Sequence, residues 1–130
     1  MAIEFQVTLE DKPGSLAWLG RTLSEGGVNI EAMQARSGNG VSVAFFVPDD
    51  PTATAASLEE AGIPYSSREV LVVRVLDQPG MLADVALVMA EAGINIDCVY
   101  FTMKGRVVFG VDDLDGATQV AGGMAVLTAE

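Results

Sequence analysis

The sequence contains no histidine and only one cysteine, Cys98. Without histidine the chain lacks the side chain most often used for acid–base catalysis near neutral pH, which is also a frequent metal ligand. A single cysteine excludes an intrachain disulfide and a multi-cysteine zinc site. The residues around Cys98, DCVYF, are typical of a strand, where a lone cysteine is usually a small buried hydrophobic residue. We therefore expect no catalytic residue, no metal site and no cofactor.

Basic residues are also scarce. The chain has 7 Lys and Arg against 18 Asp and Glu, a net charge of −11, and this surface charge repels phosphate backbones. No apolar run approaches the ~20 residues of a membrane span, and MAIEFQVTLE lacks the features of a signal peptide. Half of the residues are hydrophobic, which supports a packed core. We expect a cytoplasmic protein with no nucleic-acid partner and no membrane partner.

The sequence does contain an internal repeat. The stretch DKPGSLAWLGRTLSEGGVNIE, residues 11–31, is matched 66 positions later by DQPGMLADVALVMAEAGINID, residues 77–97. Duplication is the simplest account. It divides the chain into units of residues 1–68 and 69–130 with almost no linker. The identical pairs are Asp11/Asp77, Pro13/Pro79, Gly14/Gly80, Leu16/Leu82, Ala17/Ala83, Glu25/Glu91, Gly27/Gly93, Asn29/Asn95 and Ile30/Ile96.

Each copy begins with a strand and a helix. IEFQVTL alternates apolar and polar residues, VLVVRVL is apolar almost throughout, and both are expected first strands. After each Pro-Gly turn apolar residues recur at helical spacing, and Gly27 and Gly93 follow as helix stop signals. The expected core positions of these helices are Leu16, Leu19 and Leu23 in the first copy and Leu82, Val85 and Met89 in the second.

The remaining elements also recur. NIEAMQAR and NIDCVYFTM are expected second strands, and VSVAFFV and RVVFGV are expected third strands. SGNG predicts a hairpin because Asn-Gly readily adopts the positive φ of a tight turn, and Lys104-Gly105 is expected to do the same in the second copy. A second helix, PTATAASLEEAG or LDGATQVAGG, precedes a fourth strand near 64–68 or 124–128.

The order βαββαβ, written twice, predicts an α+β protein of two ferredoxin-like units in tandem. Each unit is expected to have an antiparallel sheet with both helices on one face. A unit of ~65 residues buries a small core and has open sheet edges. We therefore expect the units to pack together, and whole chains to form a homodimer or higher homo-oligomer.

The loop between the first strand and the first helix is a candidate binding site. Gly14 and Gly80 would let a ligand approach the backbone amides at the start of the helix, and these amides suit a carboxylate. The amides in question belong to Ser15 and Leu16 in the first copy and to Met81 and Leu82 in the second. The alternative is that Pro-Gly only makes the turn while Asp11 and Asp77 begin the helices.

Asn29 and Asn95 open the second strands, although asparagine disfavours strands. Each side chain could donate to and accept from a polar ligand. The alternative is a loop residue that bonds to the local backbone. The two copies also differ, since Ser15 corresponds to Met81 and Trp18 to Asp84. We expect two half-sites that bind unequally.

The phrase D-x-P-G-x-L-A…G-[VI]-N-I-[ED] within a βαββαβ pattern resembles the ACT domain family over both halves of the chain. The resemblance implies a small-molecule sensor, most often for an amino acid, that regulates a metabolic enzyme or transcription. It also implies a ligand at the interface of two units, held by first-loop amides of one and the strand-two Asn of the other. By motif position the implied site residues are Asp11, Gly14, Ser15, Leu16, Asn29 and Ile30, with Asp77, Gly80, Met81, Leu82, Asn95 and Ile96.

Many ligand-binding members of that family have Asn where this chain has Asp11 and Asp77. An ionised Asp repels a carboxylate and attracts an ammonium group, so the orientation of a ligand is left open. The leading hypothesis is a non-enzymatic tandem ACT regulator of a separate partner. The alternatives are an assembly module that binds no ligand and an enzyme on the same scaffold. The enzyme is disfavoured because no histidine, metal cluster or basic phosphate site is present.

Overall fold

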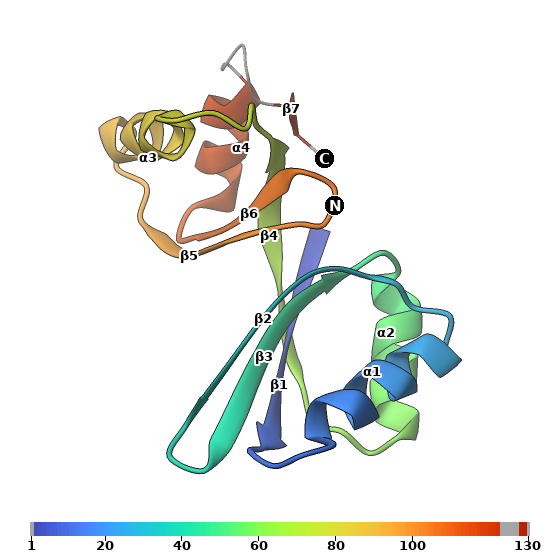
Figure 1. Ribbon diagram of the computed structural model, residues 1–130. Helices are drawn as coiled ribbons and strands as arrows, with labels where there is room; N and C mark the ends of the chain where they lie inside the picture. Colours follow the sequence, from blue (N-terminus) through green and yellow to red (C-terminus); the bar gives the residue numbers. More distant parts are fainter. Residues whose placement is uncertain (1, 123–127, 130) are drawn as a thin grey trace. The chain divides into compact units, whose positions relative to one another are not determined.

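The computed structural model describes residues 2–122 and 128–129 (Figure 1). The chain divides into two compact units, which we call the first unit (Ile3–Arg68) and the second unit (residues from Glu69 onward, with Ala2). The helices are α1 (Ser15–Glu25), α2 (Pro51–Glu60), α3 (Met81–Glu91) and α4 (Leu114–Gly122). The strands are β1 (Ala2–Glu10), β2 (Ile30–Gly38), β3 (Val41–Pro48), β4 (Ser66–Arg74), β5 (Ile96–Phe101), β6 (Arg106–Val111) and β7 (Thr128–Ala129).

The first unit is an antiparallel sheet covered by α1 and α2. Its strand order is β2-β3-β1, with β4 beside β1. Alternate residues of β1 share one buried cluster with residues of both helices. The central members of this cluster are Phe5, Val7, Leu19, Leu23, Phe46 and Leu58.

The second unit repeats this arrangement with α3 and α4. Its strand order is β4-β6-β5, and β7 pairs with β4. Its buried cluster includes Leu71, Val73, Val85, Met89, Phe109 and Ala117, from both helices and the central strands. The predicted α+β class, with ferredoxin-like antiparallel units and helices on one face, is confirmed.

The predicted helix core positions need one correction in each copy. Leu16 and Leu82 are 53% and 50% exposed, whereas Leu19 and Val85 are buried. Because α1 and α3 begin at Ser15 and Met81, positions four and eight residues after these share one face of the helix. Positions 16, 19 and 23 lie within about 60° of one another around the helix, as do 82, 85 and 89, so the predicted spacing itself holds. Leu16 and Leu82 are the second residues of their helices, and neither belongs to the buried cluster of its unit.

The strand predicted to close the first unit and the strand predicted to open the second are one element. β4 runs without a break from Ser66 to Arg74, so the chain passes from one unit to the other inside a strand. The strand predicted at 124–128 lies outside the described residues except for Thr128, which belongs to β7.

The two hairpins differ in form. Asn39 and Gly40 have φ of 55° and 81°, as a two-residue turn of the predicted kind requires. In the second unit Gly105 has φ 74° but Lys104 is not in the positive-φ region, so the predicted equivalence is wrong. Thr102 instead organises a longer connection, because its Oγ1 accepts hydrogen bonds from the amides of Lys104 (3.2 Å) and Arg106 (3.0 Å).

The second hairpin is also shorter. Met33 pairs with Phe46, 13 residues later, whereas Val99 pairs with Phe109, only 10 residues later. The β1–β3 ladder consequently continues to the pair Glu10↔Val41, whereas the β4–β6 ladder ends at Arg74↔Arg106. Val75 and Leu76, which occupy the repeat positions of Leu9 and Glu10, lie beyond that ladder. This difference determines the shape of the candidate site.

Candidate functional site

The first loops of the two units have the same backbone conformation. Gly14 and Gly80 both have φ 91°, and each is the residue that caps its helix, with no side-chain cap. A Cβ at either position would meet nothing within 4 Å, so conformation rather than crowding requires glycine. Asp11 and Asp77 cap neither helix, and the alternative in which they begin the helices is wrong.

The helix starts offer fewer open amides than the motif implies. The amide of Ser15 donates to the carbonyl of Lys12, and that of Met81 to the carbonyl of Gln78, both at 3.3 Å. The amides of Leu16 and Leu82 have no acceptor among the described residues. Each loop therefore presents one of the two predicted amides without a competing partner.

Asn29 and Asn95 hold a corner of each unit through their backbones. The amide of Asn29 donates to Oδ1 of Asp49, and the Asp49 amide donates to the Asn29 carbonyl, both at 2.9 Å. Asn95 and Asp112 repeat the two bonds at 3.0 and 3.2 Å. The side chains of both asparagines are exposed. These bonds join the main chain of each asparagine to an aspartate 20 or 17 residues further along the chain, and the amide side chains stay accessible.

The aspartates of these corners were not predicted from the sequence. Asp49 and Asp112 are each followed by a second aspartate, which caps the next helix by accepting from a backbone amide at 3.0 Å. The pattern Asp-Asp after the third strand recurs 63 positions apart rather than 66. Allowing a gap in the hairpin would have revealed it.

Asn29 and Asn95 lie at the far end of the first helix from the loop of their own unit. Ile30 and Ile96, which follow them, are half-buried and pack against the core of their own unit. None of the four lines a described cavity beside a first loop. That an asparagine of one unit meets the loop of another stays a prediction.

Asp11 ties the first loop to the β2–β3 hairpin. Its Oδ1 accepts a hydrogen bond of 2.9 Å from Oγ of Ser37, at the end of β2. Its amide donates to the carbonyl of Gly40 at 3.3 Å. Side chain and backbone of Asp11 thus both attach the loop to the hairpin.

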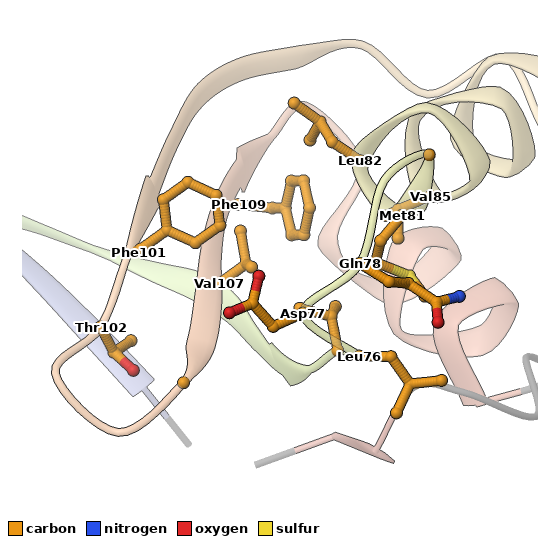
Figure 2. A pocket seen from close by; sticks show the side chains of 13 residues that line it. Leu76, Asp77, Gln78, Met81, Leu82, Val85, Phe101, Thr102, Val107 and Phe109 are labelled. Atoms are coloured by element: carbon orange, nitrogen blue, oxygen red, sulfur yellow. The ribbon is translucent and has the colours of Figure 1, made fainter.

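No described bond attaches Asp77 to the β5–β6 hairpin. A cavity of about 460 Å³ lies between its loop and that hairpin (Figure 2). Among the described residues, the Asp77 carboxylate has no hydrogen-bond or ion-pair partner. Four of the predicted residues line the cavity, namely Asp77, Gly80, Met81 and Leu82. The rest of the lining is mostly apolar and comes from α3 and the β5–β6 hairpin, including Val85, Phe101, Val107 and Phe109.

The first unit has its cavity on another side of the loop. It measures about 590 Å³ and lies against residues 62–64, between α2 and β4, rather than against the hairpin. Of the predicted residues it includes Gly14 and Ser15, but not Asp11 or Leu16. Lys12 and Trp18 also line it, and Nζ of Lys12 forms an exposed ion pair of 2.9 Å with Glu10.

Within residues 2–122 and 128–129, no three His, Cys, Asp or Glu side chains are grouped so that they could hold a metal ion. No helix in this part of the chain is long and apolar enough to cross a membrane.

Comparison with known proteins identifies the family. A family model described as an ACT domain pair matches residues 1–123. The chain belongs to the ACT domain family. A search of curated proteins finds no match for this ACT domain pair.

Solved structures share its fold. Protein BT0572 from Bacteroides thetaiotaomicron is 22% identical, with a TM-score of 0.88 over 98% of this chain and 92% of that one. The ligand-free regulatory subunit of aspartate kinase from Thermus thermophilus is 17% identical, with a TM-score of 0.69 over 94% and 91%. The corresponding subunit from Thermus flavus is 19% identical, with a TM-score of 0.65 over 92% and 88%.

Proposed function

We propose that this ACT domain pair is a non-enzymatic cytoplasmic regulator that binds a small ligand, an amino acid, at its first loops. It passes the level of that ligand to a separate protein, a metabolic enzyme, and works as a homodimer or higher homo-oligomer. The regulatory subunits of aspartate kinase have a similar fold, which makes an amino-acid-controlled enzyme a reasonable class of partner.

One observation carries the proposal, namely that each first loop borders a cavity. Gly14 and Gly80 adopt a conformation that other residues rarely take, and both lie at the wall of a cavity. Both volumes, about 460 and 590 Å³, fall in the range of roughly 300–1,000 Å³ typical of small-molecule sites. A turn needed only for folding would not require open space beside it in both copies.

Calorimetric titration of the full chain with each of the twenty amino acids tests the proposal. We expect heat and a raised melting temperature with at least one of them. Replacing Asn29 and Asn95 by Ala together tests whether the exposed amides take part, and Thr52→Ala, an exposed change outside both loops, is the control. No heat and no thermal stabilisation with any amino acid would refute ligand binding.

A second candidate function is an assembly module that binds no ligand. Exposed apolar side chains favour it, since Leu87, Phe101 and Met103 are 59%, 68% and 86% exposed. Sedimentation analysis with and without the amino acids separates the two functions. A constant mass that no amino acid changes, together with co-purification of an enzyme, would favour the assembly module.

A further inference from the structure

The cavity of the second unit results from the shorter hairpin. In the first unit, hydrogen bonds from Ser37 to Asp11 and from Asp11 to Gly40 hold the first loop against the hairpin. In the second unit the hairpin has three residues fewer between the paired strands, and Val75 and Leu76 lie beyond the ladder. The space that the first unit closes is therefore open in the second.

The wall of this cavity is mostly apolar, both at its floor and at its rim. Met81, Val85, Val107 and Phe109 are buried and also belong to the core of the unit, so they form a firm floor. At the rim, Leu82 and Phe101 remain 50% and 68% exposed, on α3 and on the hairpin, and Figure 2 shows them on either side of Phe109. An apolar ligand would remove this surface from water, which favours binding.

Among the described residues that line the cavity, Asp77 alone carries a charge. No other residue that the structure places along the cavity is ionisable, and no described group pairs with this carboxylate. Figure 2 shows the Asp77 carboxylate turned toward Val107 of the hairpin, whereas the amide of Gln78 points away. An unpaired carboxylate beside an apolar wall attracts a cation and repels an anion.

The field of the whole chain has the same sign. With a net charge of −11, the protein raises the local concentration of small cations at its surface and lowers that of anions. Local and global electrostatics therefore favour the same kind of ligand. A ligand of this cavity therefore needs both a positive charge and an apolar part.

We infer that the cavity of the second unit binds a small apolar molecule that carries a protonated amine, with the ammonium group paired to Asp77. An amino acid with an apolar side chain has this chemistry, and so does a simple arylalkyl or alkyl amine. The inference that this ligand is the regulator's signal rests on the proposed function. The cavity and the charge of Asp77 do not depend on that proposal. The first unit takes no such ligand at its hairpin, because the carboxylate of Asp11 already accepts a hydrogen bond from Ser37.

Three probes that share a phenylethyl group and differ in their terminal charge are titrated calorimetrically into the full chain. They are 2-phenylethylamine, 2-phenylethanol and 3-phenylpropanoate. We expect the amine to bind about tenfold more tightly than the alcohol, and the propanoate most weakly. Phenylalanine and leucine as further titrants distinguish an amino-acid ligand from a simple amine. Equal affinity for all three probes, tighter binding of the propanoate, or no binding of any probe would overturn the inference.

Asp77→Asn removes the charge and keeps the shape at an exposed position. We expect it to abolish the preference for the amine, while Asp115→Asn, the same change at an exposed position of the second unit outside the cavity lining, leaves the amine affinity unchanged. Phe101→Ala is expected to weaken binding about tenfold, and Leu87→Ala, also more than half exposed but outside the cavity, is its control. Circular dichroism and melting curves establish that each variant folds. Unchanged amine affinity in Asp77→Asn would contradict the assignment.

The two proposals fail separately. If an amino acid binds and Asp77→Asn changes nothing, the inference is wrong and the regulatory proposal stands. If 2-phenylethylamine binds through Asp77 but no amino acid does, the cavity is assigned as inferred and the amino-acid regulator is wrong.

Discussion

Oδ1 of Asp49 accepts a hydrogen bond of 2.9 Å from the backbone amide of Asn29, and Asp112 does the same for Asn95 at 3.0 Å. In both units this bond fastens the start of the second strand to the end of the third. Only the backbone of each asparagine takes part, so these bonds do not themselves require asparagine at either position. The exposed amide side chain is thereby free for another role.

Asp49→Ala should lower the free energy of unfolding by about 1 kcal/mol, since it removes one charge-assisted hydrogen bond at an exposed site. Urea unfolding measures the loss. Glu60→Ala is a suitable control, because Glu60 is exposed and has no bonded partner within the described residues, and its change should stay within about 0.5 kcal/mol. Equal effects of the two changes would show that the corner bond contributes nothing.

Gly14→Ala and Gly80→Ala should each destabilise the protein by roughly 1–2 kcal/mol, because an L side chain at φ 91° is strained even where space is open. Gly20→Ala, inside α1 and also with open space at its Cβ, should instead stabilise it by about 0.5–1 kcal/mol. Chemical denaturation of the three variants compares the effects. Stabilisation by Gly14→Ala would contradict the left-handed conformation of the loop.

Leu19→Ala should cost about 2–5 kcal/mol of unfolding free energy, since it leaves a cavity in the core of the first unit. Leu16→Ala, three residues earlier and 53% exposed, should change it by no more than about 0.5 kcal/mol. Thermal and urea unfolding of both variants show whether Leu16 is exposed, as in the structure, or buried, as expected from the sequence. A large loss for Leu16 would require a partner that covers it.

The pKa of Tyr65 is raised above its ordinary value of 10.0, mainly because its hydroxyl donates a hydrogen bond of 2.6 Å to Glu59, with burial and the charge of that carboxylate adding to the effect. Folding thus favours the neutral phenol. The stabilisation is fully present below pH 10.0 and is lost as the pH rises through the folded pKa.

The difference in melting temperature between the wild type and Tyr65→Phe should accordingly stay constant below pH 10.0 and shrink as the pH rises above it. Glu59→Gln removes the carboxylate, and we expect it to shift the tyrosine absorbance titration to lower pH. A pH-independent difference between wild type and Tyr65→Phe would show that the hydrogen bond does not couple to folding.

Much of the fold followed from the sequence because the repeat provides two versions of every element. Gly27 and Gly93 end their helices, with φ of 76° and 74°, since residues just past a helix commonly take that conformation. Leu16 and Leu82 share the helix face of the buried residues, but the spacing does not show which residues at the helix start the core covers, and both lie one residue after that start.

The candidate site was less accessible to sequence reasoning. The positive-φ glycines could be expected at Gly14 and Gly80, but the cavity beside Asp77 depends on contacts between distant segments. The bond from Ser37 to Asp11 links residues 26 positions apart, and nothing in the local pattern of either residue indicates it. The β5–β6 hairpin is three residues shorter than the β2–β3 hairpin, and the effect appears in the loop of Asp77. Local sequence patterns do not predict such an effect between distant segments.

The continuous strand β4 has a consequence for how the chain can be divided. Proteases cut where several residues can leave the folded structure together, and such places are usually loops and termini. The boundary between Arg68 and Glu69 lies inside a hydrogen-bonded strand and offers no such stretch. Limited digestion should therefore not release the halves as intact domains. Expressing the halves separately, divided between Arg68 and Glu69, would leave each with only part of β4.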